Sequence, residues 1–172
     1  MKVIDNFLTE KDFDIVSSSF KNLDYKFFPQ ANFNSSSEHH FHFMHTYIDR
    51  WECQYENADY IPRIIMNTYC KLYKKSVTLI KARFNLFVKT SNKSEAMGYH
   101  QDIIDVKETN IDPHTILMYI EDSNGSTEFK DGTNVMSKRN RVVLFHNDDF
   151  HQTISSTDTL FRRNININFV ED

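Results

Sequence analysis

The sequence contains little glycine, proline or cysteine: three, three and two residues in 172. So few Gly and Pro residues exclude a collagen-like chain and argue against an unfolded, low-complexity one. The two cysteines, Cys53 and Cys70, are too few for a disulfide scaffold and are expected to be ordinary buried or half-buried thiols. The chain must therefore be stabilised by a hydrophobic core, to which its 15 Phe residues can contribute.

The chain also lacks a long apolar run and an excess of positive charge. No run approaches the roughly 18–20 apolar residues of a membrane span, and the amphipathic, charged start does not resemble a signal peptide. We therefore expect a cytoplasmic protein with no membrane partner. The formal net charge of −4 gives no field for binding a phosphate backbone, so a nucleic acid is not an expected partner. Nothing in the sequence indicates an oligomeric state.

Two amphipathic segments in the first half of the chain predict helices. Thr9 can cap the first helix, and apolar residues follow it at spacings of three and four. The second helix is expected over about residues 54–74. Because Pro62 fits poorly inside a helix, the true start is expected near Tyr60.

After Lys75 the apolar period changes to two, which indicates strands. The expected strands cover residues 77–80, 83–88, 115–120, 127–129, 142–145, 153–154 and 165–170. We therefore expect residues 1–172 to form one domain of the mainly β (α+β) class. Residues 1–75 would form a helical N-terminal support, and residues 76–172 an antiparallel barrel or sandwich with the helices packed on one sheet.

His100 and Asp102 are candidate metal ligands. Residues two apart on an extended chain point to the same side, so both side chains can bind one ion. His151, after a predicted strand and a turn, is the expected third ligand; His146 is the alternative. Two imidazoles and one carboxylate leave coordination positions open, an arrangement that suits Fe(II) enzymes binding a co-substrate and O₂.

Arg162 is a candidate anion-binding residue near the start of the final strand. Alternation places Arg162 on one face of that strand and its neighbour Arg163 on the other. The face of Arg162 is polar throughout, and its other members are Asn164, Asn166 and Asn168. A guanidinium inside a barrel needs an anion, and a dicarboxylate would supply one. This favours Arg162, with Arg163 as the alternative.

These residues lie within a longer pattern. It consists of the runs 98–102, 114–122, 125–129 and 141–145, followed by His151 and Arg162. The pattern resembles the 2-oxoglutarate/Fe(II)-dependent dioxygenase superfamily, in particular its prolyl 4-hydroxylase-like branch with small viral and bacterial members. The resemblance implies a double-stranded β-helix (jelly-roll) fold and a hydroxylase that converts 2-oxoglutarate to succinate and CO₂. It also implies Fe(II), 2-oxoglutarate and O₂ as cofactor and co-substrates, with ascorbate as a stimulant.

The resemblance also implies roles for individual residues. His100, Asp102 and His151 match the metal triad. Arg162 matches the basic residue that pairs with the distal carboxylate of 2-oxoglutarate. The further co-substrate candidates are Tyr119, at the same carboxylate, Asn164, beside the Arg, and Asn85, nearer the metal.

Departures from the pattern of particular branches narrow the expected reaction. Collagen-type prolyl hydroxylases usually carry Lys where this chain has Arg162, so a collagen-like substrate is not implied. The nucleic-acid dealkylases carry a second Arg shortly after the first, which is missing here. The halogenating branch replaces the carboxylate, but Asp102 is present. A hydroxylase of peptidyl proline or another protein side chain is favoured, with free amino acids and small metabolites as alternatives.

Two other functions fit part of the pattern. One is a non-catalytic jelly-roll module that binds a metal or ligand without turnover, and the other is a cupin-type metalloenzyme, in which Arg162 would have no task. The histidines at 39, 40, 42 and 45 lack the spacing of a closed zinc site. We expect them to form an exposed tract or a polar loop near the substrate entrance.

Overall fold

The computed structural model describes residues 1–29, 41–54, 60–103 and 111–172. In these residues the chain is mainly β, with two α-helices and one short 3₁₀ helix. The elements are, in chain order, β1 (Lys2–Ile4), α1 (Glu10–Ser19), η1 (Phe20–Asn22), β2 (Lys26–Pro29), β3 (Phe41–Asp49), β4 (Glu52–Cys53), α2 (Tyr60–Tyr73), β5 (Val77–Val88), β6 (His114–Tyr119), β7 (Ser126–Phe129), β8 (Asn134–Met136), β9 (Arg141–His146), β10 (His151–Ile154) and β11 (Phe161–Glu171).

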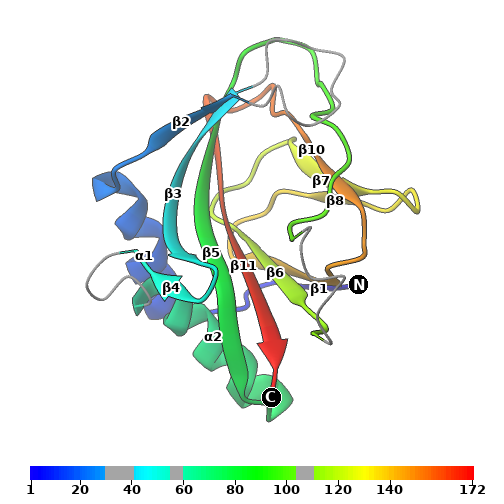
Figure 1. Ribbon diagram of the computed structural model, residues 1–172. Helices are drawn as coiled ribbons and strands as arrows, with labels where there is room; N and C mark the ends of the chain where they lie inside the picture. The colour runs from blue at the N-terminus through cyan, green and yellow to red at the C-terminus, as the bar shows by residue number, and fades with distance from the viewer. Residues whose placement is uncertain (30–40, 55–59, 104–110) are drawn as a thin grey trace.

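The strands form two antiparallel sheets. The large sheet has the order β1-β9-β6-β11-β5-β3-β2, with β4 paired to β3 at one end of that strand. The small sheet has the order β10-β7-β8 and lies on the opposite side of the molecule from the helices (Figure 1). The arrangement is a jelly roll, which confirms the predicted mainly β fold.

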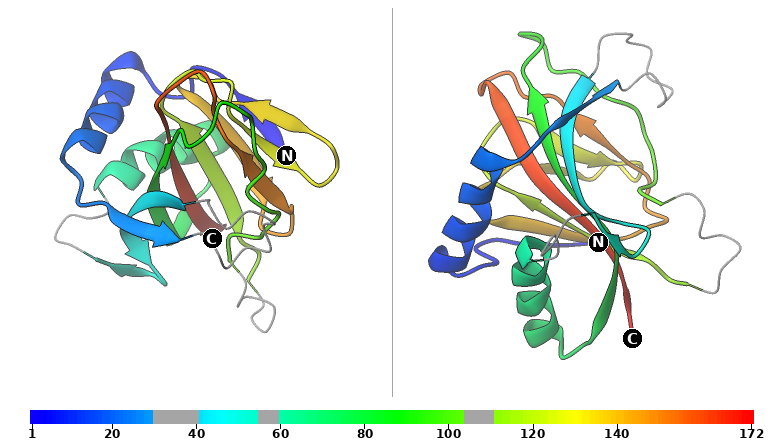
Figure 2. Two further views of the ribbon diagram at one scale, coloured as in Figure 1. Left: turned by 90° about the horizontal axis from the view of Figure 1, so that it is seen from above. Right: turned by 60° about the vertical axis from the view of Figure 1, so that its left-hand side comes forward.

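Both helices pack on one side of the large sheet (Figures 1 and 2). The Thr9 hydroxyl accepts a hydrogen bond from the Asp12 amide at 3.2 Å and so caps α1, as predicted. The main core joins apolar residues of α1 and α2 to the large sheet, and it includes Phe13, Val16, Ile65, Met66, Phe84, Ile116, Ile165 and Ile167. The predicted packing of helices on one sheet is therefore confirmed. No helix among the described residues is long and apolar enough to span a membrane.

The start of α2 at Tyr60 agrees with the expectation drawn from Pro62. Pro62 lies in the first turn, where backbone N–H groups have no partner within the helix, so its missing N–H costs little. The strands expected at 77–80 and 83–88 are one continuous strand, β5.

The first 75 residues contribute more than the expected helical support. They also supply β1, β2, β3 and β4, all of which belong to the large sheet. The alternation in β3 is obscured because its buried positions include His42 and His45, and because its pairing with β5 shifts register between Thr46 and Ile48.

A second, smaller core fills part of the space between the two sheets. Its members are Leu117, Tyr119, Phe129, Val135, Val143 and Phe145. Beside it the facing sides of the sheets become polar and enclose a cavity of about 220 Å³. The fold thus separates an apolar outer face of β5 and β11, covered by helices, from a polar inner face that lines this cavity.

Candidate active site

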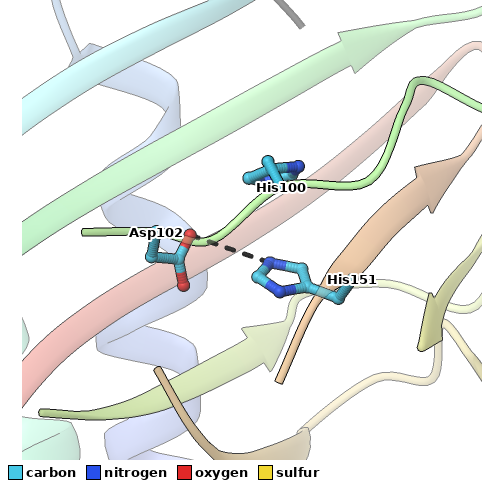
Figure 3. Close-up of side chains that lie close together, drawn as sticks. All are labelled: His100, Asp102 and His151. Atoms are coloured by element: carbon cyan, nitrogen blue, oxygen red, sulfur yellow. Dashed lines mark ion pairs between the residues drawn. The ribbon is translucent and has the colours of Figure 1, made fainter. Parts of the chain in front are cut away.

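His100, Asp102 and His151 lie together in the cavity, as the sequence predicts (Figure 3). Each offers one ligand atom, and these atoms lie within 4.8 Å of one another. Two backbone hydrogen bonds, of 2.9 and 3.1 Å, join residue 100 to residue 151 at the start of β10. This short antiparallel bridge brings together segments that lie about fifty residues apart in the chain.

The carbonyl contacts of the two imidazoles indicate which nitrogen of each ring can bind a metal. Nδ1 of His100 lies 3.2 Å from the Gly98 carbonyl oxygen, and Nδ1 of His151 lies 3.1 Å from the Asp149 carbonyl oxygen. A carbonyl oxygen only accepts, so each Nδ1 carries the proton and donates it. Nε2 of each ring is then the nitrogen whose lone pair can bind a metal.

The Asp102 carboxylate is held by donors from two strands. Asn166 Nδ2 lies 3.0 Å from both carboxylate oxygens. Oδ2 also accepts hydrogen bonds from the side-chain amide of Asn168 at 3.2 Å and from the hydroxyl of Thr115 at 3.1 Å. Burial by itself raises the pKa of Asp102, but the positive charge that His151 and His100 carry when protonated, together with the Asn166 hydrogen bond, outweighs burial and lowers the pKa to about 2. The carboxylate is therefore ionised at neutral pH and ready to bind a cation.

The alternative ligand, His146, lies outside this group. Its Nε2 is paired with the carboxylate of Asp112, and its ring packs at 5.4 Å from that of His114. Among the described residues, the only group of three or more ligand-type side chains close enough to share one metal ion is His100, Asp102 and His151.

Arg162 is buried between the sheets, with 1% of its surface exposed. Its guanidinium lies 5.6 Å from the Phe87 ring centre and 5.3 Å from that of Tyr119, and Nη2 donates to the Thr127 hydroxyl at 3.3 Å. Nε and Nη1 are buried without a hydrogen-bond partner. Burial accordingly lowers the pKa of this guanidinium. A buried cation with two unused donors is costly unless an anion binds there.

Arg163 points to the other side of the sheet. Its guanidinium forms an ion pair of 2.7 Å with Glu121 and lies over the Phe20 ring on the helix side. The alternation predicted for β11 is confirmed: Arg162 faces the interior and Arg163 faces outward.

The three further co-substrate candidates lie near Arg162. The Tyr119 hydroxyl donates to Thr127 Oγ1 at 2.8 Å, so both Tyr119 and Arg162 contact the same threonine. Asn85 Nδ2 donates to Asn164 Oδ1 at 2.9 Å, and both amides line the cavity. The structure thus places Asn164 and Asn85 in the lining of the cavity and Tyr119 beside it, in contact with the lining residue Thr127; their roles in binding 2-oxoglutarate stay predictions.

The structure adds residues that the sequence did not single out. Thr127 contacts both Arg162 and Tyr119, and Thr115 contacts Asp102. Lys81 and Arg83 on β5 also line the cavity. Alternation along β5 from Asn85, and along β6 from Tyr119, could have identified Lys81, Arg83 and Thr115, because each lies an even number of residues away.

The expectation for the histidine tract is wrong where it can be compared. His42 and His45 belong to β3 and are buried rather than exposed, each with 7% of its surface accessible. His42 lines the cavity and stacks on Phe87 at 4.9 Å, whereas the His45 Nδ1 bonds to the Asp24 carbonyl oxygen. His39 and His40 lie outside the described residues.

Comparison with known proteins identifies the fold. No family model matches the chain, and no curated protein matches it in sequence. Solved structures do match: a 2OG-Fe(II) oxygenase family oxidoreductase from Burkholderia pseudomallei has a TM-score of 0.71 at 7% identity, covering 98% of this chain and 84% of that one. The chain has the fold of the 2-oxoglutarate/Fe(II) oxygenases.

Two further matches are prolyl hydroxylases. One, from Trichoplax adhaerens and in complex with a hypoxia inducible factor peptide fragment, has a TM-score of 0.68 at 12% identity and covers 99% of this chain and 83% of that one. The other, a viral collagen prolyl hydroxylase from Paramecium Bursaria Chlorella virus-1 with 2OG, has a TM-score of 0.60 at 11% identity and covers 99% and 94%. The resemblance to this fold group read from the sequence is thereby confirmed.

Proposed function

We propose that the protein is a 2-oxoglutarate- and Fe(II)-dependent oxygenase that hydroxylates an unactivated C–H bond of a peptide or protein side chain, with peptidyl proline as one candidate. The observation that carries the proposal is the buried Arg162, whose Nε and Nη1 have no partner and whose Nη2 contacts Thr127, a residue that lines the same cavity as the His-Asp-His triad. The triad fits a divalent metal, and the unused donors fit a carboxylate.

His100, Asp102 and His151 would hold Fe(II), and Arg162, with Tyr119, Asn164 and Asn85 nearby, would hold 2-oxoglutarate. The bound metal and co-substrate, with O₂, supply oxidative decarboxylation to succinate and CO₂ coupled to hydroxylation of a C–H bond. Ascorbate is expected to stimulate the reaction.

The protein's own contribution is orientation, charge and exclusion of water. The Gly98 and Asp149 carbonyl oxygens fix the ring orientation of the two histidines. Phe129 and Phe145 pack around His151 with ring centres 5.9 and 4.8 Å away, which shields that side of the triad from solvent.

The comparisons support a peptide or protein substrate only by analogy, because the Trichoplax adhaerens protein is a prolyl hydroxylase in complex with a peptide fragment. That protein covers nearly the whole of this chain in structure but shares 12% of its residues. The choice of substrate therefore depends on the residues of this cavity rather than on the fold.

The test is metal- and co-substrate-dependent succinate formation. Metal-free protein receives Fe(II) and 2-oxoglutarate without oxygen, O₂ is admitted, and succinate is measured with and without candidate peptides. Turnover in the wild type that is lost in Asp102→Ala supports the oxygenase. Absence of both turnover and metal-dependent 2-oxoglutarate binding would refute the oxygenase and favour the non-catalytic module. Binding without turnover would direct the search to further candidate peptides and metabolites.

A further inference from the structure

We infer that the substrate of this site carries an oxyanion, a carboxylate or a phosphate, which Lys81 and Arg83 bind. The inference rests on the proposed function and specifies its substrate class. Both side chains line the cavity that contains the triad. Neither is needed for the metal or for the co-substrate roles described above.

The pairing of β5 with β11 gives the positions of these cations along the cavity. Phe87 pairs with Arg162, and four residues further along β11, Asn166 pairs with Arg83. Two residues further along β11, Asn168 pairs with Lys81, just before the register shift between Asn168 and Phe169. At about 3.3 Å per residue, the row of Arg83 lies roughly 13 Å from the row of Arg162. The cavity-facing side of β5 and β11 therefore has Arg162 at one end and Arg83 and Lys81 toward the other.

The triad carboxylate lies at the end that holds Lys81 and Arg83. Asp102 is bound by Asn166 and Asn168, the cross-strand partners of these two cations, and Lys81 Nζ donates to the Asp102 backbone carbonyl oxygen at 3.2 Å. A dicarboxylate bound to Arg162 at the other end leaves Lys81 and Arg83 available to a second molecule.

The negative charge near Lys81 and Arg83 is incomplete. Lys81 donates a hydrogen bond to a neutral carbonyl group, and Nε of Arg83 is buried without a hydrogen-bond partner. Arg83 Nη2 lies 3.8 Å from Asp49, a loose contact to a side chain that is 44% exposed. The other neighbouring acid, Asp102, accepts hydrogen bonds from Asn166 and lies 3.7 Å from His151 within the triad. Apart from this triad carboxylate, the two cations face one loosely held carboxylate, that of Asp49.

This arrangement favours an oxyanion over a neutral group. A guanidinium presents paired donors that match a carboxylate or a phosphate, and an ammonium beside it adds a point charge. An apolar group would cover Arg83 without satisfying its Nε, and a neutral carbonyl group would accept a hydrogen bond from Nε without balancing the positive charge. Lys81 and Arg83 are therefore residues that determine specificity.

The experiment measures binding of three blocked amino acids to Zn(II)-loaded protein saturated with 2-oxoglutarate, without O₂. The probes are the N-acetyl methylamides of glutamate, phosphoserine and glutamine, and dissociation constants come from NMR shift titrations. We expect glutamate or phosphoserine to bind at least about tenfold more tightly than glutamine, as expected for one charge-assisted hydrogen bond. The tighter of the two anionic probes identifies the oxyanion as carboxylate or phosphate.

Variants assign the preference to the pocket. Arg83→Gln should reduce the preference for the anionic probe to less than threefold, and Arg83→Lys should retain part of it. Lys21→Gln removes an exposed cation of η1 and should leave the preference unchanged. Should Arg83→Gln fold poorly, Lys81→Gln takes its place, with a smaller loss expected.

Failure of this inference can be distinguished from failure of the proposed function. Wild-type protein that binds 2-oxoglutarate but shows no anionic preference would refute the inference and leave the oxygenase intact, as would a preference that survives in Arg83→Gln. If 2-oxoglutarate does not bind, the proposed function fails. The same titrations, done without 2-oxoglutarate, then still test the anion site. A preference for an anionic probe over the glutamine probe that is lost in Arg83→Gln would support that site.

Discussion

Replacing Arg162 by Met should weaken 2-oxoglutarate binding by about 100-fold. The guanidinium is buried with Nε and Nη1 unused, so both are free to donate to a carboxylate. Charge-assisted hydrogen bonds of this kind contribute about 1.5–3 kcal/mol each, and 100-fold in affinity corresponds to about 2.7 kcal/mol. The estimate is conservative because it counts little more than one of the two bonds.

The same substitution should leave the free protein at least as stable as the wild type. An unpaired buried guanidinium destabilises the folded state, and replacing it by an apolar side chain of similar length is commonly neutral or favourable. Met can occupy the space beside the rings of Phe87 and Tyr119 that the guanidinium now fills. The lost bond to Thr127 is long, at 3.3 Å, so its removal costs little.

Calorimetric titration of 2-oxoglutarate into Zn(II)-loaded protein measures the first effect, and thermal unfolding of the metal-free protein measures the second. Arg163→Met is the matched control: it breaks the ion pair with Glu121, costs up to about 1 kcal/mol of stability and leaves 2-oxoglutarate affinity within twofold. Affinity within threefold of wild type in Arg162→Met would refute the reasoning. So would a loss of affinity in Arg163→Met instead.

Three further predictions concern other parts of the molecule. Asp102→Ala removes a proposed metal ligand and should lower Fe(II) affinity, measured by equilibrium dialysis. The loss should exceed the roughly 100-fold caused by mutating a residue that only hydrogen-bonds to a metal ligand; unchanged affinity would contradict the metal assignment. Gly125→Ala would place Cβ 2.7 Å from Cδ of Arg162. It should therefore lower stability by about 1–3 kcal/mol and weaken 2-oxoglutarate binding, whereas normal values for both would show that the close contact is not required. Arg141 and Lys138 hold the pKa of Asp5 well below its usual value, so this carboxylate stabilises the fold above its unfolded pKa, and the contribution disappears as pH falls through the folded one. Because Asp5 is 37% exposed, Asp5→Asn should cost only about 1 kcal/mol at pH 7 and nothing in strong acid; an equal cost at both pH values in denaturant unfolding would exclude this ion pair as the cause.

The residues that the sequence predicted best are those on β11 and around the triad. Strict alternation separates Arg162 from Arg163 without any knowledge of the partner strands, and the structure confirms the separation. The convergence of His100 and Asp102 follows from their spacing, since residues two apart share one side of an extended chain.

The residues that the sequence predicted poorly are those where polar side chains interrupt an apolar pattern. The charged Lys81 divides β5 into two apparent strands, which concealed that Lys81, Arg83 and Asn85 share one face. In β3 the imidazoles of His42 and His45 occupy buried positions that a hydropathy pattern assigns to solvent. For Lys81 and His42 the cause is the polar cavity, which allows inward-facing residues to be polar, whereas His45 is buried away from that cavity with Nδ1 bonded to the Asp24 carbonyl oxygen.

The apolar face of β11 fixes the geometry of the polar face. Ile165, Ile167 and Phe169 are fully buried under the helices, and the residues between them line the cavity. A slip of one residue would turn the Asn side chains toward the helices and expose three large apolar groups. Each apolar side chain contributes about 1.5–3 kcal/mol by its burial, so the slip would forfeit roughly 5–9 kcal/mol, comparable to the whole stability of a domain. The core under the helices therefore determines which β11 side chains reach Asp102, and substitutions in that core should alter metal and 2-oxoglutarate binding without touching either site.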